Sequence, residues 1–263
     1  MTKIIVILQK EWSEIIQQRA LMLTIILLPL LFTLIPIAAI TTTSQIDLSS
    51  TNTSTVAIAK VMPSLAGMNS KEVGQALIGM QMSILYILLP VVITSVIASY
   101  SIVGEKTSRT LEPLLATPVH TSELLLGKSL AALIPAVVVT WIAGGLFIAF
   151  VALFAVSNHV FSAIVSPGWL IIFLLWTPVL GLIGIEMMVA ISSRVNDPRT
   201  AQQFSVFLVL PVIGLIFGQI SGLLVLGPIF ALSAFVVLVL VAILAVWIVT
   251  RLFQREVILT RWK

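Results

Sequence analysis

Residues 100–128 read YSIVGEKTSRTLEPLLATPVHTSELLLGK, a charged stretch that separates two long apolar runs. A helix needs roughly 20 apolar residues to cross the hydrocarbon core of a bilayer. The sequence contains six runs of about this length or longer, at residues 20–40, 82–103, 124–154, 169–191, 204–226 and 228–252. We therefore expect an all-α polytopic membrane protein with six transmembrane helices.

The composition agrees with this fold class. Hydrophobic residues make up 59% of the 263 residues, charged residues 9%, and the mean hydropathy is +1.19. Soluble domains carry about 25% charged residues. The apolar runs leave no room for a soluble catalytic domain of roughly 100–150 residues, so residues 1–263 are interpreted as a single transmembrane domain. The chain has no cysteine, which excludes disulfides and thiolate metal sites.

The basic residues predict which side of the membrane is cytoplasmic. Of the 14 basic residues, only Lys60 and Lys71 fall on one side of the expected spans, and the other 12 fall on the opposite side. Both termini are therefore expected in the cytoplasm of a prokaryotic cell. The net charge of +4 follows from this asymmetry and does not favour nucleic-acid binding. Glu11 and Glu14 precede the first apolar run, so we expect a retained helix and not a cleaved signal peptide.

Residues 1–19 predict an amphipathic helix that lies in the cytoplasmic membrane interface. Its expected apolar face carries Ile4, Leu8, Trp12 and Ile15, and its expected polar face carries Lys10, Glu11, Glu14 and Gln18. Between the first two spans, residues 41–81 form an external segment with a short helix expected at 73–80. Thioethers bind Cu(I), but packing is the favoured interpretation of the methionines in or next to this segment, Met62, Met68, Met80 and Met82.

Residues 104–123 form the first expected cytoplasmic loop, and residues 112–118 predict a short rigid helix within it. Thr110 is its expected N-cap, Pro113 suits the first turn and Pro118 ends it. Further along, Gly127-Lys128-Ser129 resembles the end of a phosphate-binding loop. That motif requires a glycine where Ser122 stands, so we predict no ATP site in this chain.

Three other features lie within or between the later spans. Glu186 is an intramembrane carboxylate, which we expect either to line a path or, as the favoured alternative, to pair with Arg194 or a neighbouring protomer. The second cytoplasmic loop, residues 192–203, is interrupted at Asp197-Pro198, and the next helix is expected to begin at Thr200. Glycines and a proline break residues 218–228, which favours a re-entrant hairpin over a simple loop.

The sequence of residues 105–118 and 122–128 resembles the first cytoplasmic loop of ABC-2 type transporter permeases, and the sequence of residues 191–203 resembles the second. The interfacial helix matches the elbow helix of that family, and the resemblance implies a type V exporter-like fold. In the family, the first loop carries a coupling helix that contacts a separate ATPase. The implied ATPase-coupling residues are Glu105, Arg109, Thr110, Leu111, Glu112, Pro113, Leu114, Leu115, Thr117 and Pro118, with Arg194, Asp197 and Arg199 in the second loop.

The resemblance also implies a function. The chain would be a permease that forms a homodimer or heterodimer in the cell membrane, holds two cytoplasmic ATPase subunits and exports a substrate. ATP and Mg would be bound by the ATPases, so no cofactor, metal or catalytic residue is expected in this chain. The alternatives are a self-sufficient ion channel or ion-coupled secondary transporter, in which Glu186 would be central, and a membrane anchor without a path.

Overall fold

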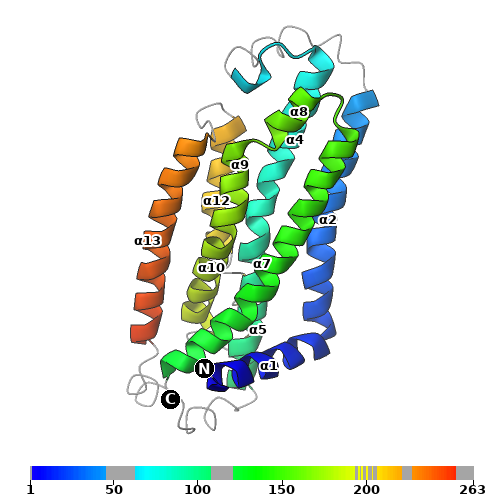
Figure 1. Cartoon of the computed structure of the whole chain (residues 1–263). Helices are drawn as coiled ribbons and strands as arrows, with labels where there is room; N and C mark the ends of the chain where they lie inside the picture. Colours follow the sequence, from blue (N-terminus) through cyan, green and yellow to red (C-terminus); the bar gives the residue numbers. More distant parts are fainter. Residues whose placement is uncertain are drawn as a thin grey trace.

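A computed structural model describes residues 2–45, 63–107, 121–192, 206–220 and 227–252, together with residues 195, 197, 200 and 203. Every regular element in these residues is helical (Figure 1). In chain order they are α1 (Thr2–Gln17), α2 (Arg19–Gln45), the 3₁₀ turn η2 (Pro63–Leu65), α4 (Ser70–Ser83), the 3₁₀ turn η3 (Ile84–Ile87), α5 (Leu88–Thr107), α7 (Thr121–Phe154), α8 (Asn158–Ile164), α9 (Pro167–Ile171), the π-helical turn η4 (Ile172–Trp176), α10 (Thr177–Ser192), α12 (Val206–Ile220) and α13 (Pro228–Leu252).

Five helical stretches among the described residues are long and apolar enough to cross a membrane. They are Arg19–Thr42, Ser70–Ser101, Leu126–Phe154, Asn158–Ser192 and Pro228–Arg251. The all-α multi-pass fold is therefore confirmed. Figure 1 shows α10 ending at the end of the bundle where α1 lies and α13 beginning at the opposite end, so the intervening chain returns across the bundle. The described part of this return is α12, and the count of six spans stays a prediction.

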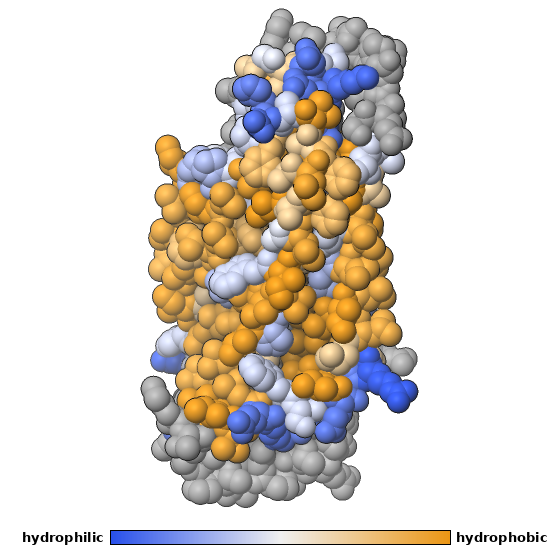
Figure 2. All heavy atoms as spheres, turned by 45° about the vertical axis from the view of Figure 1, so that its right-hand side comes forward, coloured by the Kyte–Doolittle hydropathy of each residue, from blue (hydrophilic) through white to orange (hydrophobic). Residues whose placement is uncertain are grey.

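The outer surface suits a bilayer. On the face shown in Figure 2, apolar side chains form a broad band around the middle, and hydrophilic side chains gather towards both ends. Exposed leucines on α2, such as Leu30 and Leu34, and on α13, such as Leu240 and Leu244, belong to this apolar surface. Lipid tails solvate such side chains, while the helices satisfy their own backbone hydrogen bonds.

The long helices pack closely in the centre of the bundle. A Cβ atom on Gly184 of α10 would lie 2.8 Å from Thr94 Oγ1 of α5, so glycine permits these two helices to approach at this point. Nearer the end that carries α4 and α8, the Trp169 and Phe173 rings stack with centroids 5.0 Å apart. The Trp176 indole N–H donates to the Ala231 carbonyl at 3.0 Å, which attaches α13 to the segment that leads into α10.

The structure refines two predictions from the sequence and leaves a third untested. The external helix expected at 73–80 is present within α4, but it continues through η3 into α5 instead of standing apart. The long third span is confirmed as α7, which has 34 residues with Pro135 inside the helix and crosses the bundle obliquely (Figure 1). The hairpin expected at 218–228 depends on residues 221–226, which lie outside the described residues.

Candidate functional site

Three consecutive residues near the start of α7, namely Gly127, Lys128 and Ser129, together contact α1, α5 and α10. We call them the α7 junction. They lie roughly two helical turns after the start of α7. The preceding helix, α5, ends at Thr107, so the chain that joins the two helices is the charged stretch analysed above. The α7 junction therefore lies close to both helical stems of the first loop.

Gly127 allows α1 to lie directly against α7. A Cβ atom at this position would lie 2.8 Å from Ile7 Cγ2, which is closer than the 3.5–4.0 Å or so at which carbon atoms pack well. About one turn further along α7, the Trp12 indole N–H donates to the Ala131 carbonyl oxygen at 3.1 Å. The helix α1, which is the expected elbow helix, thus contacts α7 at two positions.

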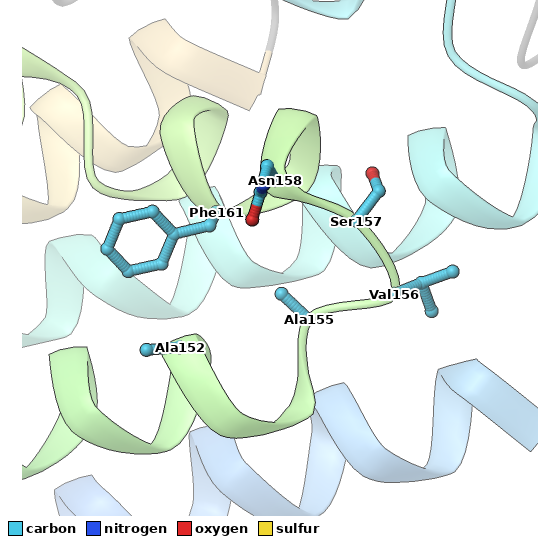
Figure 3. A pocket seen from close by; sticks show the side chains of 6 residues that line it. All are labelled: Ala152, Ala155, Val156, Ser157, Asn158 and Phe161. Atoms are coloured by element: carbon cyan, nitrogen blue, oxygen red, sulfur yellow. The ribbon is translucent and has the colours of Figure 1, made fainter.

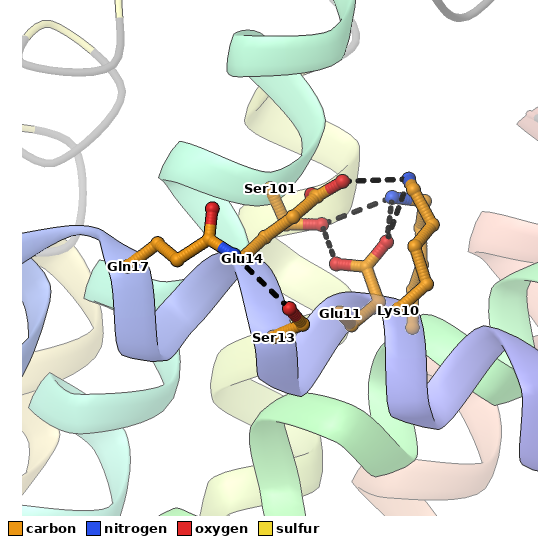
Figure 4. A network of polar contacts seen from close by, with 7 residues as sticks. Lys10, Glu11, Ser13, Glu14, Gln17 and Ser101 are labelled. Atoms are coloured by element: carbon orange, nitrogen blue, oxygen red, sulfur yellow. Dashed lines mark hydrogen bonds and ion pairs between the residues drawn. The ribbon is translucent and has the colours of Figure 1, made fainter.

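Lys128 connects α7 to α1 and α5 through a closed polar network, which we call the elbow triad and define as Glu11, Ser101 and Lys128. The Lys128 ammonium Nζ lies 2.8 Å from Glu11 Oε1 and donates to Ser101 Oγ at 3.0 Å. The Ser101 hydroxyl donates in turn to Glu11 Oε2 at 2.7 Å. Figure 4 shows Ser101 on α5 and Glu11 on α1 facing each other within this network.

The elbow triad is almost shielded from water, since the Lys128 and Glu11 side chains are only 7% and 3% exposed. Burial by itself raises the pKa of the Glu11 carboxyl. The charge of Lys128, the hydrogen bonds from Lys128 and Ser101 and the nearby Lys10 charge outweigh burial, and they lower this pKa below its ordinary value of 4.5. Glu11 is therefore ionised at neutral pH, and its contact with Lys128 is a buried ion pair.

Ser129 extends the α7 junction to a fourth helix. Its hydroxyl donates to Glu186 Oε1 of α10 at 3.1 Å, and Glu186 is only 6% exposed. Since α10 ends at Ser192, at the start of the second expected cytoplasmic loop, the α7 junction contacts helices next to both expected loops.

The comparisons with known proteins agree with this architecture. A family model described as ABC-2 family transporter protein matches residues 5–231. The chain belongs to the ABC-2 transporter family. No curated protein matches it. Membership in this family indicates the permease component of an ABC transporter, a membrane component that is not itself catalytic and that acts with ABC ATPase subunits in general.

In this ABC-2 chain, most of the predicted coupling residues lie outside the described residues. Glu105 belongs to the last turns of α5. The others in the first loop cannot be assigned a geometry: Arg109, Thr110, Leu111, Glu112, Pro113, Leu114, Leu115, Thr117 and Pro118. Their contact with an ATPase stays a prediction.

The second loop is described in part. Asp197 is exposed, and its carboxylate accepts hydrogen bonds from the Thr200 backbone N–H at 3.2 Å and from the Thr200 hydroxyl at 3.0 Å. Thr200 is helical, as the sequence predicted. Arg194 and Arg199 lie outside the described residues, so the proposed pairing of Glu186 with Arg194 stays a prediction, and Ser129 is the polar contact of Glu186 that the described chain provides.

The prediction that Glu11 lies on the polar face of the elbow helix is wrong. Glu11 is buried against α5 and α7 because its charge is paired there. Its position was detectable, because residues 4, 8, 11 and 15 recur at helical spacing, so Glu11 falls within the apolar stripe. Trp12, expected on that stripe, is 40% exposed beside the exposed Ile5 and Ile16. The elbow helix thus has separate faces for protein, lipid and water.

The methionines of the external segment and a cavity beside α7 do not form a catalytic site in the described part of the chain. Met68 and Met80 pack against the hydrophobic core, as the packing interpretation expects, and the described residues contain no group of three or more His, Cys, Asp or Glu side chains that could hold a metal. A cavity of about 490 Å³ opens beside the end of α7, where Ser157 and Asn158 provide polar side chains (Figure 3). Its lining residues are uncharged and offer no acid–base pair: Ala152, Ala155, Val156, Ser157, Asn158 and Phe161.

Proposed function

We propose that this chain is the permease subunit of an ATP-driven exporter, which forms a transport path as a dimer and is coupled to separate cytoplasmic ATPase subunits. The observation that carries the proposal is the position of the two helices that flank the charged stretch in the sequence. The helix α5 ends and α7 begins at the same end of the bundle as the elbow helix (Figure 1). The basic residues favour the cytoplasm for this end.

In this mechanism, the ATPase subunits bind ATP and Mg and supply the energy by hydrolysis. Leu111 and Leu114 of the short helix expected in the first loop provide apolar side chains for docking on an ATPase. When the ATPases close, they displace this loop, and α5 and α7 tilt as its two stems. The tilt opens or compresses a path between the two permeases.

We infer export as the direction, in the cell membrane and with both termini cytoplasmic. The sequence lacks the Glu-Ala-Ala loop with a downstream glycine that importers use, and its external segment of 41–81 is too small for a recognition domain.

A pull-down from membranes tests the coupling. The tagged chain is expected to retain an ATPase activity in the eluate, and the double variant Leu111→Asp/Leu114→Asp is expected to lose it, because two buried carboxylates would oppose docking. Val156→Asp is the matched control, since Val156 is an exposed side chain that follows the end of α7, and α7 ends at the opposite end of the bundle (Figure 1). Equal ATPase recovery from all three proteins would contradict the proposed docking site.

Glu186 favours one alternative, a self-sufficient ion channel or ion-coupled transporter, since a carboxylate buried among membrane-spanning helices is costly and is a functional candidate by default. The purified chain, reconstituted alone in vesicles, would then move ions without any ATPase, and Glu186→Gln would abolish this movement. Absence of transport by the chain alone, together with recovery of an ATPase, would support the exporter.

A further inference from the structure

The elbow triad connects the two stems of the first loop to each other and to the elbow helix. Ser101 lies roughly two turns before the end of α5, and Lys128 lies roughly two turns after the start of α7. Glu11, on α1, contacts both side chains: its carboxylate lies 2.7 Å from Ser101 Oγ and 2.8 Å from Lys128 Nζ. These contacts bridge residues that are 90 and 117 positions apart in the chain.

The geometry makes this connection rigid. Each member of the elbow triad contacts the two others, so no member can shift without lengthening two short hydrogen bonds. Because Glu11 and Lys128 are almost fully buried, water cannot readily replace a lost partner, and separation leaves an uncompensated charge. The close contact of Gly127 with Ile7 prevents α1 from sliding towards α7.

The other faces of the elbow helix restrict where it can go. Ile5, Trp12 and Ile16 are exposed apolar side chains, whereas Lys10 and Glu14 are half-exposed and joined by an ion pair at 3.3 Å. An amphipathic helix with these faces remains in the plane of the membrane interface. The membrane interface therefore opposes any displacement of α1, and α1 cannot rotate freely about its own axis.

We propose that Glu11, Ser101 and Lys128 are positioning residues that make α1, α5 and α7 move as one body when an ATPase displaces the first loop. This inference rests on the proposed function. Without the elbow triad, the loop could move while the elbow helix stays behind, and ATP hydrolysis would become uncoupled from the tilt of the spans. The contact between Ser129 and Glu186 extends the same body to α10.

The absence of cysteine from the sequence provides a direct test. Cysteines at positions 7 and 127 form a suitable pair, since the Cβ atoms would lie 3.2 Å apart, close to the 3.5–4.5 Å or so of natural disulfides, and Ile7→Cys removes the side-chain atoms that crowd Gly127. The full complex with its ATPase is oxidised with and without ATP and vanadate, and disulfide yield is measured from the gel shift of thiols modified with maleimide-polyethylene glycol. ATPase rate is measured in parallel on the same complexes without the cysteines.

With the elbow triad intact, we expect the same disulfide yield in both nucleotide states. In Lys128→Met, we expect the disulfide yield to fall several-fold when nucleotide binds. The variant should still recover the ATPase, but the ATPase rate should be the same with and without the permease. Exchange of the charges, Glu11→Lys with Lys128→Glu, is expected to restore both readouts in part. Lys71→Met is the matched control, an exposed lysine on α4 at the other end of the bundle, and should behave as wild type.

If Lys128→Met does not accumulate in the membrane, Ser101→Ala replaces it, because this variant removes the bridging hydroxyl and leaves the ion pair. Wild-type behaviour of the accumulated variants in both assays, with the ATPase still recovered, would overturn the inference and leave the proposed function intact. If the wild-type chain recovers no ATPase, the proposed function fails and the inference fails with it.

Discussion

The two ends of the helical bundle bury polar side chains in different ways. At the end with the elbow helix, an ionised glutamate and a lysine pair across three helices. At the opposite end, Gln75 is fully buried and binds backbone groups instead. Its amide nitrogen donates to the Phe154 carbonyl at 3.0 Å and lies 3.4 Å from the Ile40 carbonyl, and its amide oxygen accepts from the Val156 N–H at 2.9 Å.

Gln75 and the elbow triad both join distant segments, but they depend on different physics. The amide carries no charge and satisfies the Phe154 carbonyl and the Val156 N–H at the end of α7, which this helix cannot satisfy itself. The ion pair is stronger in a shielded site, yet removal of one partner leaves a buried charge. We infer that the end with Gln75 is a static cap, whereas the end with the elbow helix moves as one body.

The largest expected effect comes from Lys128→Met. We expect it to reduce the free energy of unfolding by up to about 3–5 kcal/mol, because Glu11 would remain buried with only the more exposed Lys10, 3.6 Å away, as a counter-charge. Thermal or denaturant unfolding in detergent measures this loss. The double variant Glu11→Gln/Lys128→Met removes both charges and should recover much of the stability. A double variant that is no more stable than Lys128→Met would show that packing, and not charge, dominates the elbow triad.

Acidification should produce the next largest effect, and at the end of the bundle with the elbow helix it acts through Glu11. The folded-state pKa of Glu11 lies below 4.5, so its stabilising contribution is fully present above that value and is lost as pH falls through the lower folded-state pKa. The stability difference between wild type and Glu11→Gln should therefore shrink in this acidic range. The effect stays smaller than that of Lys128→Met because a protonated carboxyl keeps part of its hydrogen bonding. Glu14→Gln, which changes an exposed carboxylate on the same helix, is the control and should leave this pH dependence in place.

Gln75→Leu should have a moderate effect that does not vary with pH. It leaves the Val156 N–H and the Phe154 carbonyl without their partner, at a cost of about 1–3 kcal/mol. We expect a lower unfolding temperature and an unchanged ATPase rate in the complex. If this variant uncouples the ATPase as strongly as Lys128→Met does, the contrast between a static and a moving end is wrong.

Ser129→Ala should have the smallest effect, about 1 kcal/mol, since it removes a single hydroxyl donor from Glu186. Unfolding in detergent measures it, and Ser162→Ala, whose hydroxyl is exposed and contacts only the carbonyl of its own helix, is the control. A loss as large as that of Lys128→Met would show that Glu186, like Glu11, is a buried carboxyl group that depends on α7.

Sequence patterns predicted the fold better than the site. Apolar runs are local signals, and they predicted the all-α multi-pass fold, which is confirmed, and a helix within residues 1–19, which is present as α1. The wording of 105–118 and 191–203 pointed to the ABC-2 family, which the match over 5–231 confirms. The coupling residues of the first loop other than Glu105 lie outside the described residues, so that part of the predicted site remains to be tested by the Leu111 and Leu114 variants.

The sequence by itself determined the fold class and the family, because hydrophobic length and loop motifs can be read along a single segment, and its charge asymmetry predicts the cytoplasmic side. Only the tertiary structure decided that Glu11 and Lys128, 117 positions apart, share one buried site with Ser101. Helical periodicity shows which residues share a face, but it does not show which other helix covers that face. Gly127 allows α1 to pack closely across α7. This packing brings Lys128, near a loop, and Glu11, in an apolar stripe, together as one ion pair.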